Sequence, residues 1–392
     1  MRADTLEPVV FVTDIRFWQN TYGSHMRIRR LVQMMHRIRP VRVFCLMPLR
    51  DEDRNQIAAE NLSTIEIVSF TDWVDDAAPV RWTTYAKRPF FDKHRNATFS
   101  AALSAYLGAH RAHSVVLEYI RLAYLRDACA LDLPVFLDLH DIMSTRAVAL
   151  AGAGLKASIE IDPAQERAIL GAMTQVIAIS TTDADFLRSR FGLKNVLYVP
   201  YTLDTVRHDA TQRDPKCLLF IGARSQPNIS GLRWLLDQVM PVLAQHGFML
   251  NVVGTICDAF ANRTDTGVVW HGQQDALDPF LATAGLSVNP VFVGGGLKIK
   301  CLDSLAHGLP VVTTTEGAAG LDIAVGAGLY VARSRSEFIN IVLELAQDPV
   351  ALRLASQLAY RAVRAGFSDE AMAQSLQAAF GPLSAEEDNR HD

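Results

Sequence analysis

Short apolar runs alternate with segments of helical periodicity along almost the whole chain. Apolar runs of about four to eight residues joined by helical segments are typical of parallel strands with crossover helices. The pattern predicts two series of strands, at 8–12, 41–47, 64–70, 114–118, 134–138, 175–179 and 196–199, and then at 217–221, 249–253, 268–271, 285–289, 310–314 and 328–331. Helical patterning in the second series is clearest at 230–244, 276–283, 298–306 and 335–346. The expected fold is α/β, with two doubly wound, Rossmann-like units in tandem.

A polar segment separates the two series of strands. We predict an N-terminal domain at 1–205, a linker at 206–216 and a C-terminal domain at 217–365. Helical patterning continues beyond these and predicts a last helix at 366–383, followed by a polar tail at 384–392 that we expect to be disordered. Doubly wound sheets bind ligands beyond the carboxyl ends of their strands, so the cleft between the units is the expected binding site.

Composition narrows the class of protein. The 392 residues are 49% hydrophobic and 20% charged, enough for two globular cores, and the net charge of −4 gives no reason to expect nucleic-acid binding. The five cysteines are scattered without a C-x-x-C pair, which favours a reducing compartment over a disulfide framework or a zinc site. The N-terminus lacks the apolar core of a signal peptide, and no run approaches the ~18 apolar residues of a membrane span. We expect a cytoplasmic protein.

The segment 27–42 is rich in arginine, with apolar residues at helical spacing between the charges. We favour its interpretation as the first crossover helix, with an apolar core stripe and a solvated face. The alternative is a basic surface that contacts anionic lipid, which would place the protein peripherally at the inner face of a membrane. The arginines concerned are Arg27, Arg29, Arg30, Arg37, Arg39 and Arg42.

Three consecutive glycines, 294–296, stand between a predicted strand and a predicted helix. Such a turn lets the backbone approach a ligand closely and directs amide groups at an anion. Lys298 and Lys300 add positive charge, and Asp303 follows Lys300 by one helical turn, where it could accept hydrogen bonds from sugar hydroxyls. A tight corner without function is the alternative. The ATP-binding and dinucleotide-binding glycine signatures are absent from the sequence.

Several blocks in this half occur together in the order of a known family. They are 220–234, 253–254, 269–272, 294–310 and 315–321. This stretch resembles the nucleotide-sugar half of the group 1 glycosyltransferases, which are retaining enzymes of the GT-B fold. The N-terminal half is similar at 22–24, at Asp138-Leu139-His140-Asp141 and at 166–180, and the segment from Phe367 resembles the family's last helix, which crosses back onto the first domain.

The resemblance implies roles for particular residues. Asp303 would hold the ribose, while Lys298, then Arg224 and then Lys300 would contact the diphosphate together with the amides of Gly294, Gly295 and Gly296. For Lys300 we favour a solvated helix charge instead. Gly23 and Gly222 would give room for the donor, Glu316 matches the family's turn carboxylate, and His140 would lie near the transferred sugar, where a structural histidine is the alternative.

Two departures from the family accompany these assignments. A glutamate that usually contacts the donor sugar is replaced here by Gly295, and Asn228 stands near the usual position of a phosphate-binding lysine. Two D-x-D pairs, Asp183 with Asp185 and Asp51 with Asp53, are interpreted as structural, so no metal is expected.

The resemblance implies a metal-independent hexosyltransferase without a cofactor. It would move a sugar from a nucleotide diphosphate sugar to a carbohydrate, lipid-linked or protein acceptor with retention of configuration, in glycan or polysaccharide biosynthesis. A sugar-nucleotide epimerase of the same fold and a non-catalytic partner protein are the alternatives.

Overall fold

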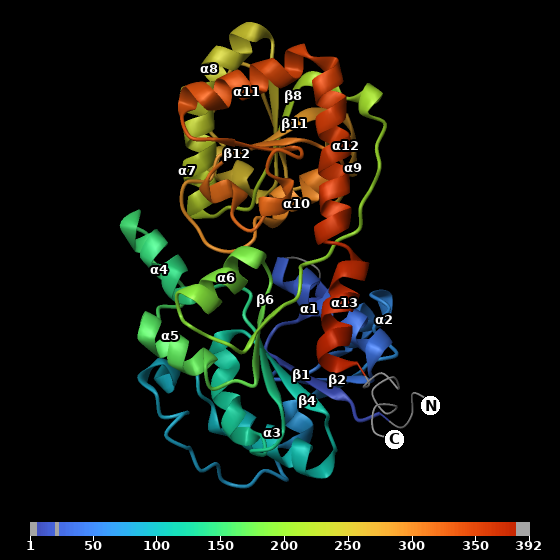
Figure 1. Ribbon diagram of the computed structural model, residues 1–392, viewed down its shortest axis with the longest axis vertical. Coiled ribbons are helices and arrows are strands. Elements are labelled where there is room, and N and C mark those ends of the chain that lie inside the picture. Colours follow the sequence, from blue (N-terminus) through green and yellow to red (C-terminus); the bar gives the residue numbers. More distant parts are fainter. Residues whose placement is uncertain (1–5, 20–22, 382–392) are drawn as a thin grey trace, which may run out of the picture. The chain divides into compact units, whose positions relative to one another are not determined.

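The computed structural model describes residues 6–19 and 23–381, and the chain divides into two compact units (Figure 1). The first unit comprises residues 1–144, 160–202 and 369–392, and the second comprises 145–159 and 203–368. The division differs from the continuous first domain that we predicted at 1–205, because 145–159 group with the second unit. The predicted linker, 206–216, already contains the start of strand β8 at Asp214. The tail predicted to be disordered lies outside the described residues.

The first unit is built on a parallel sheet of seven strands in the order β3-β2-β1-β4-β5-β6-β7. The strands are β1 (Val9–Thr13), β2 (Val41–Cys45), β3 (Glu66–Ser69), β4 (Ser114–Glu118), β5 (Val135–Asp138), β6 (Gln175–Ala178) and β7 (Val196–Tyr198). All residues of β1, β4 and β5 are buried, as expected for parallel strands covered on both faces. The seven predicted strands of this half are confirmed.

The helices of the first unit are α1 (Gly23–Ile38), α2 (Asp51–Ala59), α3 (Ala97–Ala109), α5 (Pro163–Leu170), α6 (Thr181–Ser189) and α13 (Asp369–Phe380); α4 (Met143–Gly152) begins in this unit and continues in residues assigned to the second. In α1, Ile28, Leu31, Val32 and Met35 recur at helical spacing and join the core. The last helix α13 adds Met372, Leu376 and Phe380 to the same core, so the predicted return of the C-terminal helix to the first domain is confirmed.

The arginines of segment 27–42 take part in the packing of the first unit, in α1 and in β2. Arg27 and Arg39 are buried, Arg29 pairs with Glu60, Arg30 and Arg37 lie near Asp369, and Arg42 pairs with Glu66. The predicted solvated face is therefore wrong for most of these residues, because only the Arg37 side chain is largely exposed, at 69%. The crossover-helix interpretation of the segment is confirmed. These ion pairs neutralise positive charge that a surface for anionic lipid would need.

The second unit contains a parallel six-stranded sheet in the order β10-β9-β8-β11-β12-β13. Its strands are β8 (Asp214–Ile221), β9 (Met249–Val253), β10 (Val268–Gly272), β11 (Ala284–Asn289), β12 (Val311–Thr314) and β13 (Leu329–Ala332). The order runs outward on both sides from β8 and β11, so loops that follow these two central strands lie side by side at the carboxyl edge. The six predicted strands of this half are confirmed.

The helices of the second unit are α7 (Gln226–Trp234), α8 (Met240–Leu243), α9 (Asp278–Thr283), α10 (Ile299–Ala306), α11 (Arg335–Gln347) and α12 (Pro349–Gly366). The single helix predicted at 230–244 is interrupted by a π-helical turn at Leu235–Val239. Pro241 follows this turn and has no amide hydrogen, so the regular i to i−4 ladder cannot continue through it. Asp348 caps α12 by accepting hydrogen bonds from the amides of Val350 and Ala351.

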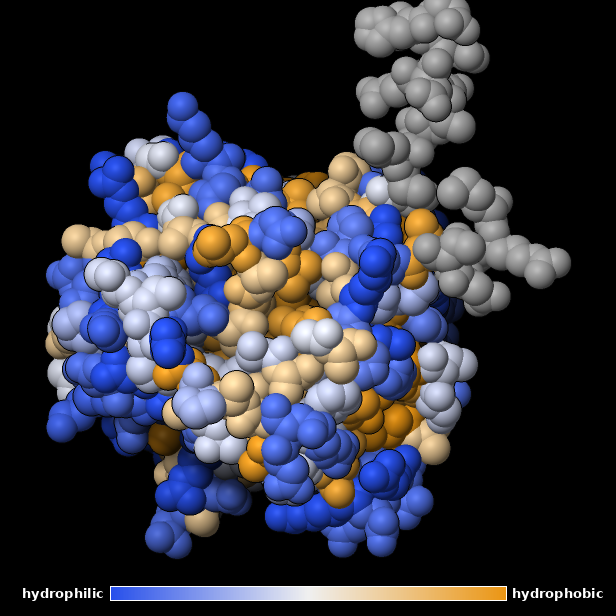
Figure 2. All heavy atoms as spheres, turned by 90° about the horizontal axis from the view of Figure 1, so that it is seen from below, coloured by the Kyte–Doolittle hydropathy of each residue, from blue (hydrophilic) through white to orange (hydrophobic). Residues whose placement is uncertain are grey.

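Within the described ranges, no helix combines the length and the apolar character that crossing a bilayer requires. On the face seen in Figure 2, hydrophilic side chains surround smaller groups of apolar ones. The surface is therefore that of an ordinary globular α/β protein on this side.

Candidate functional site

The three glycines of the second unit form the connection from β11 to α10. Gly294 has φ 155° and Gly296 has φ 67°, backbone conformations that side chains with a Cβ rarely adopt. The helix α10 begins directly after this turn, and no side chain caps its first amides. An uncapped helix start beside a glycine turn is suited to bind an anion.

The side chain of Lys298 folds back onto the glycine turn that precedes it. Its ammonium group donates hydrogen bonds to the carbonyl oxygens of Gly295 and Gly296 and lies 3.0 Å from Glu316 Oε1. The side chain of Lys298 is only 9% exposed. Glu316 also lines a cavity of about 330 Å³ that Trp234 and Phe292 help to form. The structure thus brings three of the predicted donor elements together: the glycine turn, Lys298 and Glu316.

Lys300 differs from its predicted environment. Its ammonium group donates a 2.7 Å hydrogen bond to Asn228 Oδ1 and lies 5.0 Å from the centre of the Phe220 ring. Burial lowers the pKa of Lys300 to about 8. The interpretation as a solvated helix charge, which we favoured, is therefore wrong, because α10 turns this side chain toward the end of β8, where it is bonded to Asn228 and only partly exposed.

Asp303 lies one turn further along α10. Burial alone raises the pKa of its carboxyl group to about 7. Among the described residues no ion pair joins it to Lys300, although the two are one helical turn apart. Asp303 is partly exposed and has no cation beside it, so its carboxyl group is open to hydrogen bonds from ligand hydroxyls.

Arg224 and Gly222 follow β8 at the same edge of the sheet. The amide of Arg224 donates a hydrogen bond to Thr255 Oγ1, which fixes this loop to the loop after β9. The Arg224 side chain is exposed. The predicted donor residues of this unit therefore lie in loops that follow strands or in the first turns of α10, but no hydrogen bond or ion pair joins the Arg224 side chain to Lys298 or Asp303 in the described structure.

His140 belongs to a buried polar cluster in the first unit. Its Nε2 atom lies 2.8 Å from Glu118 Oε2 and 3.3 Å from Asp138 Oδ2. Tyr119 stacks on the imidazole with ring centres 4.0 Å apart, and His140 itself has φ 44°. Strained backbone of this kind is retained where the surrounding structure holds it, and it clusters at functional sites.

Arg27 neutralises part of this cluster. Its guanidinium group donates two hydrogen bonds to the carboxylate of Asp138 and a third to the carbonyl of Pro200. The pKa of Asp138 is lowered by Arg27 and His140 against the effect of burial, whereas burial and the nearby Asp138 raise the pKa of Glu118 to about 7. The two carboxyl groups therefore differ in charge near neutral pH, which is typical of acid and base pairs in active sites.

The atoms of Glu118, Asp138 and His140 are close enough together to hold a metal ion. However, the guanidinium group of Arg27 already bonds both oxygens of Asp138, so a divalent cation would have to displace a buried positive charge. The geometry fits a hydrogen-bonded network better than a metal centre.

Sequence reasoning found His140 but missed Glu118, Asp138 as a charged partner, and Arg27. Glu118 and Asp138 end two buried apolar strands, and a carboxylate at such a place is a signal that could have been used. Nothing in the sequence indicates that Arg27, 111 residues from Asp138, is its partner. Gly23 begins α1, and the hydroxyl of the next residue, Ser24, hydrogen-bonds Tyr119 beside His140.

The acids of the two D-x-D pairs that have partners in the fold serve local structure. Asp183 and Ser180 cap the start of α6, and Asp53 accepts hydrogen bonds from Trp18 and Arg16. The structural interpretation of the pairs is confirmed for these two residues.

Comparisons with known proteins agree with this geometry. Residues 215–348 match the model of the family described as glycosyl transferases group 1. No curated protein matches the sequence significantly. Among solved structures, sucrose-phosphate synthase from Thermosynechococcus elongatus superposes with a TM-score of 0.66 at 15% identity, over 95% of this chain and 98% of that one.

Two further structures are similar over their whole length. TarM from S. aureus, solved with fondaparinux, alpha-GlcNAc-glycerol and UDP, has a TM-score of 0.68 at 9% identity and covers 96% of this chain and 100% of its own. HepE from Anabaena, solved with UDP and glucose, has a TM-score of 0.66 at 12% identity and covers 95% and 99%. Residues 215–348 thus match the model of the group 1 glycosyl transferases, and the chain has, over nearly its full length, the GT-B fold of these solved structures.

Proposed function

We propose that the protein is a retaining hexosyltransferase that moves a sugar from a nucleotide diphosphate sugar to an acceptor hydroxyl. The observation that carries this proposal is the arrangement at the start of α10, where a glycine turn, an uncapped helix and the Lys298–Glu316 pair stand inside the segment that matches the family. It is an anion-binding arrangement with hydroxyl acceptors nearby.

The diphosphate of the donor would bind at the amides of Gly294, Gly295 and Gly296. Lys298 is held by Glu316 and two carbonyl oxygens, and these hydrogen bonds can be exchanged for bonds to phosphate oxygens. Negative charge develops on the leaving diphosphate in the transition state, so donors held in place here act on the rate as well as on binding. Arg224 is the exposed cation that would complete this set.

Lys300 offers a second cation that supports the same assignment. The family resemblance expects a lysine near Asn228, and the structure brings the ammonium group of Lys300 to within 2.7 Å of that asparagine. The helix α7 has Asn228 where the family has a lysine, and Lys300 of α10 supplies a cation at this place instead. Asp303 would accept the ribose hydroxyls, since no partner in the fold uses its carboxyl group.

His140 would act on the transferred sugar. Glu118 and Asp138 hold its Nε2 atom, so the imidazole has a fixed orientation. No side chain is assigned as a covalent nucleophile; the departing phosphate would take the proton of the acceptor hydroxyl on the face from which it leaves, which yields retention. Neither a metal ion nor a cofactor is needed for this scheme.

For the acceptor and for the location in the cell, we propose only a general class. HepE and TarM were solved with UDP and sugar-containing compounds, which supports a UDP-hexose as the first donor to test. A carbohydrate, lipid-linked or protein acceptor in glycan or polysaccharide synthesis fits such a donor. All five cysteines are free thiols, in keeping with a reducing cytoplasm.

A thermal-shift screen with UDP, GDP, ADP and their sugars tests the donor class. A ligand present at 100 times its Kd stabilises the folded state by about 2.7 kcal/mol. Lys298→Ala and Asp303→Ala should weaken donor binding at least tenfold, whereas His140→Ala should lower kcat with donor binding unchanged. No shift with any of these nucleotides would refute the proposal, and unchanged kinetics in all three variants would refute the site.

Gly295 keeps a second candidate open, a transferase-like protein without catalysis, because this position lacks the glutamate that usually contacts the sugar. Binding of a donor without release of nucleotide, in the presence of glycan acceptors, would favour it. Free or epimerised sugar formed without any acceptor would favour an epimerase of the same fold.

A further inference from the structure

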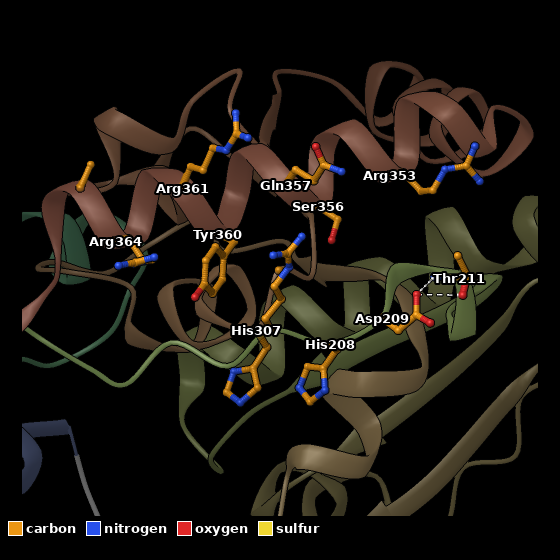
Figure 3. A pocket seen from close by; sticks show the side chains of 13 residues that line it. His208, Asp209, Thr211, His307, Arg353, Ser356, Gln357, Tyr360, Arg361 and Arg364 are labelled. Atoms are coloured by element: carbon orange, nitrogen blue, oxygen red, sulfur yellow. Dashed lines mark hydrogen bonds between the residues drawn. The ribbon is translucent and has the colours of Figure 1, made fainter.

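A large cavity in the second unit lies away from the proposed donor residues. It has a volume of about 1070 Å³, and none of the residues assigned above to the donor lines it. The helix α12 runs along one side, and its Ser356 and Tyr360 point toward His208 and His307 on the opposite side (Figure 3). Cavities of this size accommodate small-molecule ligands.

Positive charge is concentrated around this cavity. Four arginines line it, Arg207 from the chain before β8 and Arg353, Arg361 and Arg364 from α12. Asp209 is its only lining carboxylate, and that group already accepts two hydrogen bonds from Thr211. Four arginines therefore line a cavity with one carboxylate.

These arginines lack the partners that the arginines of segment 27–42 have. The arginines of segment 27–42 are engaged by carboxylates and backbone carbonyls, whereas the four at the cavity have no hydrogen bond or ion pair with any described residue. Arg364 only approaches the ring of Tyr360, at 5.8 Å. Like charges that are gathered without a counter-charge repel one another, so an anionic ligand here would relieve this repulsion.

Two stacked histidines form the wall opposite α12. The rings of His208 and His307 lie 5.3 Å apart at 16°, and the Nε2 atom of His208 is buried without a hydrogen-bond partner. His307 is fixed by contacts of Nδ1 with the carbonyl of Asp303 and of Nε2 with Asp278. A buried ring nitrogen without a partner in the fold is available to a ligand oxygen.

The cavity is built into the fold. Buried Arg213 donates hydrogen bonds to the carbonyls of Leu281, Ala284 and His307, and the amide of Val206 bonds the carbonyl of Ala306. Gly308, with φ 63°, lets α12 approach, because a Cβ there would lie 3.1 Å from Ser356 Oγ. Both walls are thus held in place without a ligand.

We propose that this cavity binds a phosphate-bearing ligand at a site separate from that of the donor. A phosphomonoester carries about −1.5 to −2 charges and matches planar guanidinium groups in bidentate geometry. Arg207 and Arg364 would bind the phosphate, and the stacked histidines and Tyr360 would contact the remainder of the ligand. The phosphate can belong to a soluble metabolite or to a lipid headgroup, which share this chemistry.

Isothermal titration of the full chain with inorganic phosphate and with pyrophosphate, at constant sodium chloride, tests the site. The double variant Arg207→Gln/Arg364→Gln should bind at least tenfold more weakly than the wild type. Both side chains are exposed, and neither forms a hydrogen bond or ion pair with a described residue, so the variant should fold normally, which circular dichroism would verify. Equal affinity of the variant and the wild type would overturn the proposal. So would a wild type that binds neither phosphate, nor pyrophosphate, nor the vesicles described below.

Two controls separate this site from others. Arg233→Gln removes an exposed arginine of α7 in the same unit and should leave binding unchanged. Lys298→Ala weakens anion binding only at the proposed donor site, so it should retain the component of binding that the double variant loses. Loss of phosphate binding in Lys298→Ala with full binding in the double variant would assign the anion to the donor site and overturn the inference. A failed nucleotide screen would leave this test unaffected.

Vesicles distinguish the two sources of phosphate. Flotation with phosphatidylcholine vesicles that contain phosphatidic acid, compared with pure phosphatidylcholine, measures headgroup binding. Retention on the former that the double variant loses, without measurable binding of free phosphate, would identify a lipid headgroup. Binding of free phosphate or pyrophosphate without retention on vesicles would identify a soluble ligand.

Discussion

At the scale of single residues, the proposed donor site contains a charge for which the fold provides no partner. Asp138, which is fully buried, has Arg27 beside it, and its pKa is lowered. Asp303 has no such cation, and burial raises its pKa to about 7. An ionised group that the fold leaves unpaired lowers stability, and such groups are found where a ligand supplies the missing interactions.

Asp303→Asn should therefore stabilise the ligand-free protein at pH 8. The raised pKa means that wild-type stability falls as the pH rises from about 3.8 to about 7, because the folded state holds a proton that the unfolded state releases. Allowing for partial exposure, the gain should be on the order of 1–3 kcal/mol at pH 8 and should vanish near pH 4. Urea unfolding at both pH values measures it.

Asp258→Asn, at an exposed aspartate of the same unit, is the matched control and should change stability by less than about 0.5 kcal/mol at either pH. A loss of stability in Asp303→Asn at pH 8 would show that the carboxylate has a partner in the fold. The same variant should bind the nucleotide more weakly, so stability and affinity should change in opposite directions.

Glu118 is expected to act as a positioning residue for His140. Its Oε2 atom accepts the hydrogen bond from His140, while its Oε1 atom is buried without a partner. Glu118→Gln should lower kcat at least tenfold with donor Kd unchanged, and it should remove the inflection of kcat near pH 7 that the carboxylate cluster produces. Steady-state kinetics across pH 5–9 would check this; an unaltered pH profile would contradict the assignment.

At the scale of elements, the turn between β11 and α10 determines what the second unit can bind. A strand, a turn with two positive φ angles and a helix with a free N-terminus follow within a dozen residues, 289–300. The backbone supplies the binding groups here, so the choice of glycine matters more than any one side chain. The two lysines at the start of this helix bond different neighbours: Lys298 bonds Glu316, and Lys300 bonds Asn228.

Gly296→Ala should destabilise the protein by about 1–2 kcal/mol, because φ 67° places its Cβ against the backbone. It should also weaken donor binding by changing the direction of the amides. Gly108→Ala is the matched control: this glycine lies in α3 with nothing within 4 Å of an added Cβ, so alanine should stabilise by up to about 1 kcal/mol. Chemical denaturation of both variants measures the contrast, and equal effects would contradict it.

At the scale of the whole molecule, the two ends of the chain stabilise the same unit. The last helix, α13, places Met372, Leu376 and Phe380 in the core that β1 and α1 begin. Arg39 donates a hydrogen bond to the carbonyl of Phe380, and the rings of Phe136 and Phe380 lie 4.4 Å apart. The first unit is therefore complete only after synthesis of the full second unit, so its stability depends on residues near the C-terminus.

Phe380→Ala should lower the stability of the first unit by about 3–5 kcal/mol, since the ring is fully buried. Hydrogen exchange should speed up in β1 and β4 but not in β8 and β11. Leu131→Ala, at a side chain that is 94% exposed in the same unit, should have no measurable effect. Equal acceleration in both sheets would show that the units unfold together.

The sequence by itself determined the two sheets, because parallel strands buried on both faces must be apolar throughout and every predicted strand is present. It also located the glycine turn with Lys298, since a run of neighbouring residues carries that signal. Only the tertiary structure decided which charges have partners: the contact of Arg27 with Asp138 and of Lys300 with Asn228 joins residues far apart in the chain. The cavity beside α12 was likewise invisible, because its arginines come from two separate segments and are distinguished by the absence of a partner among the described residues.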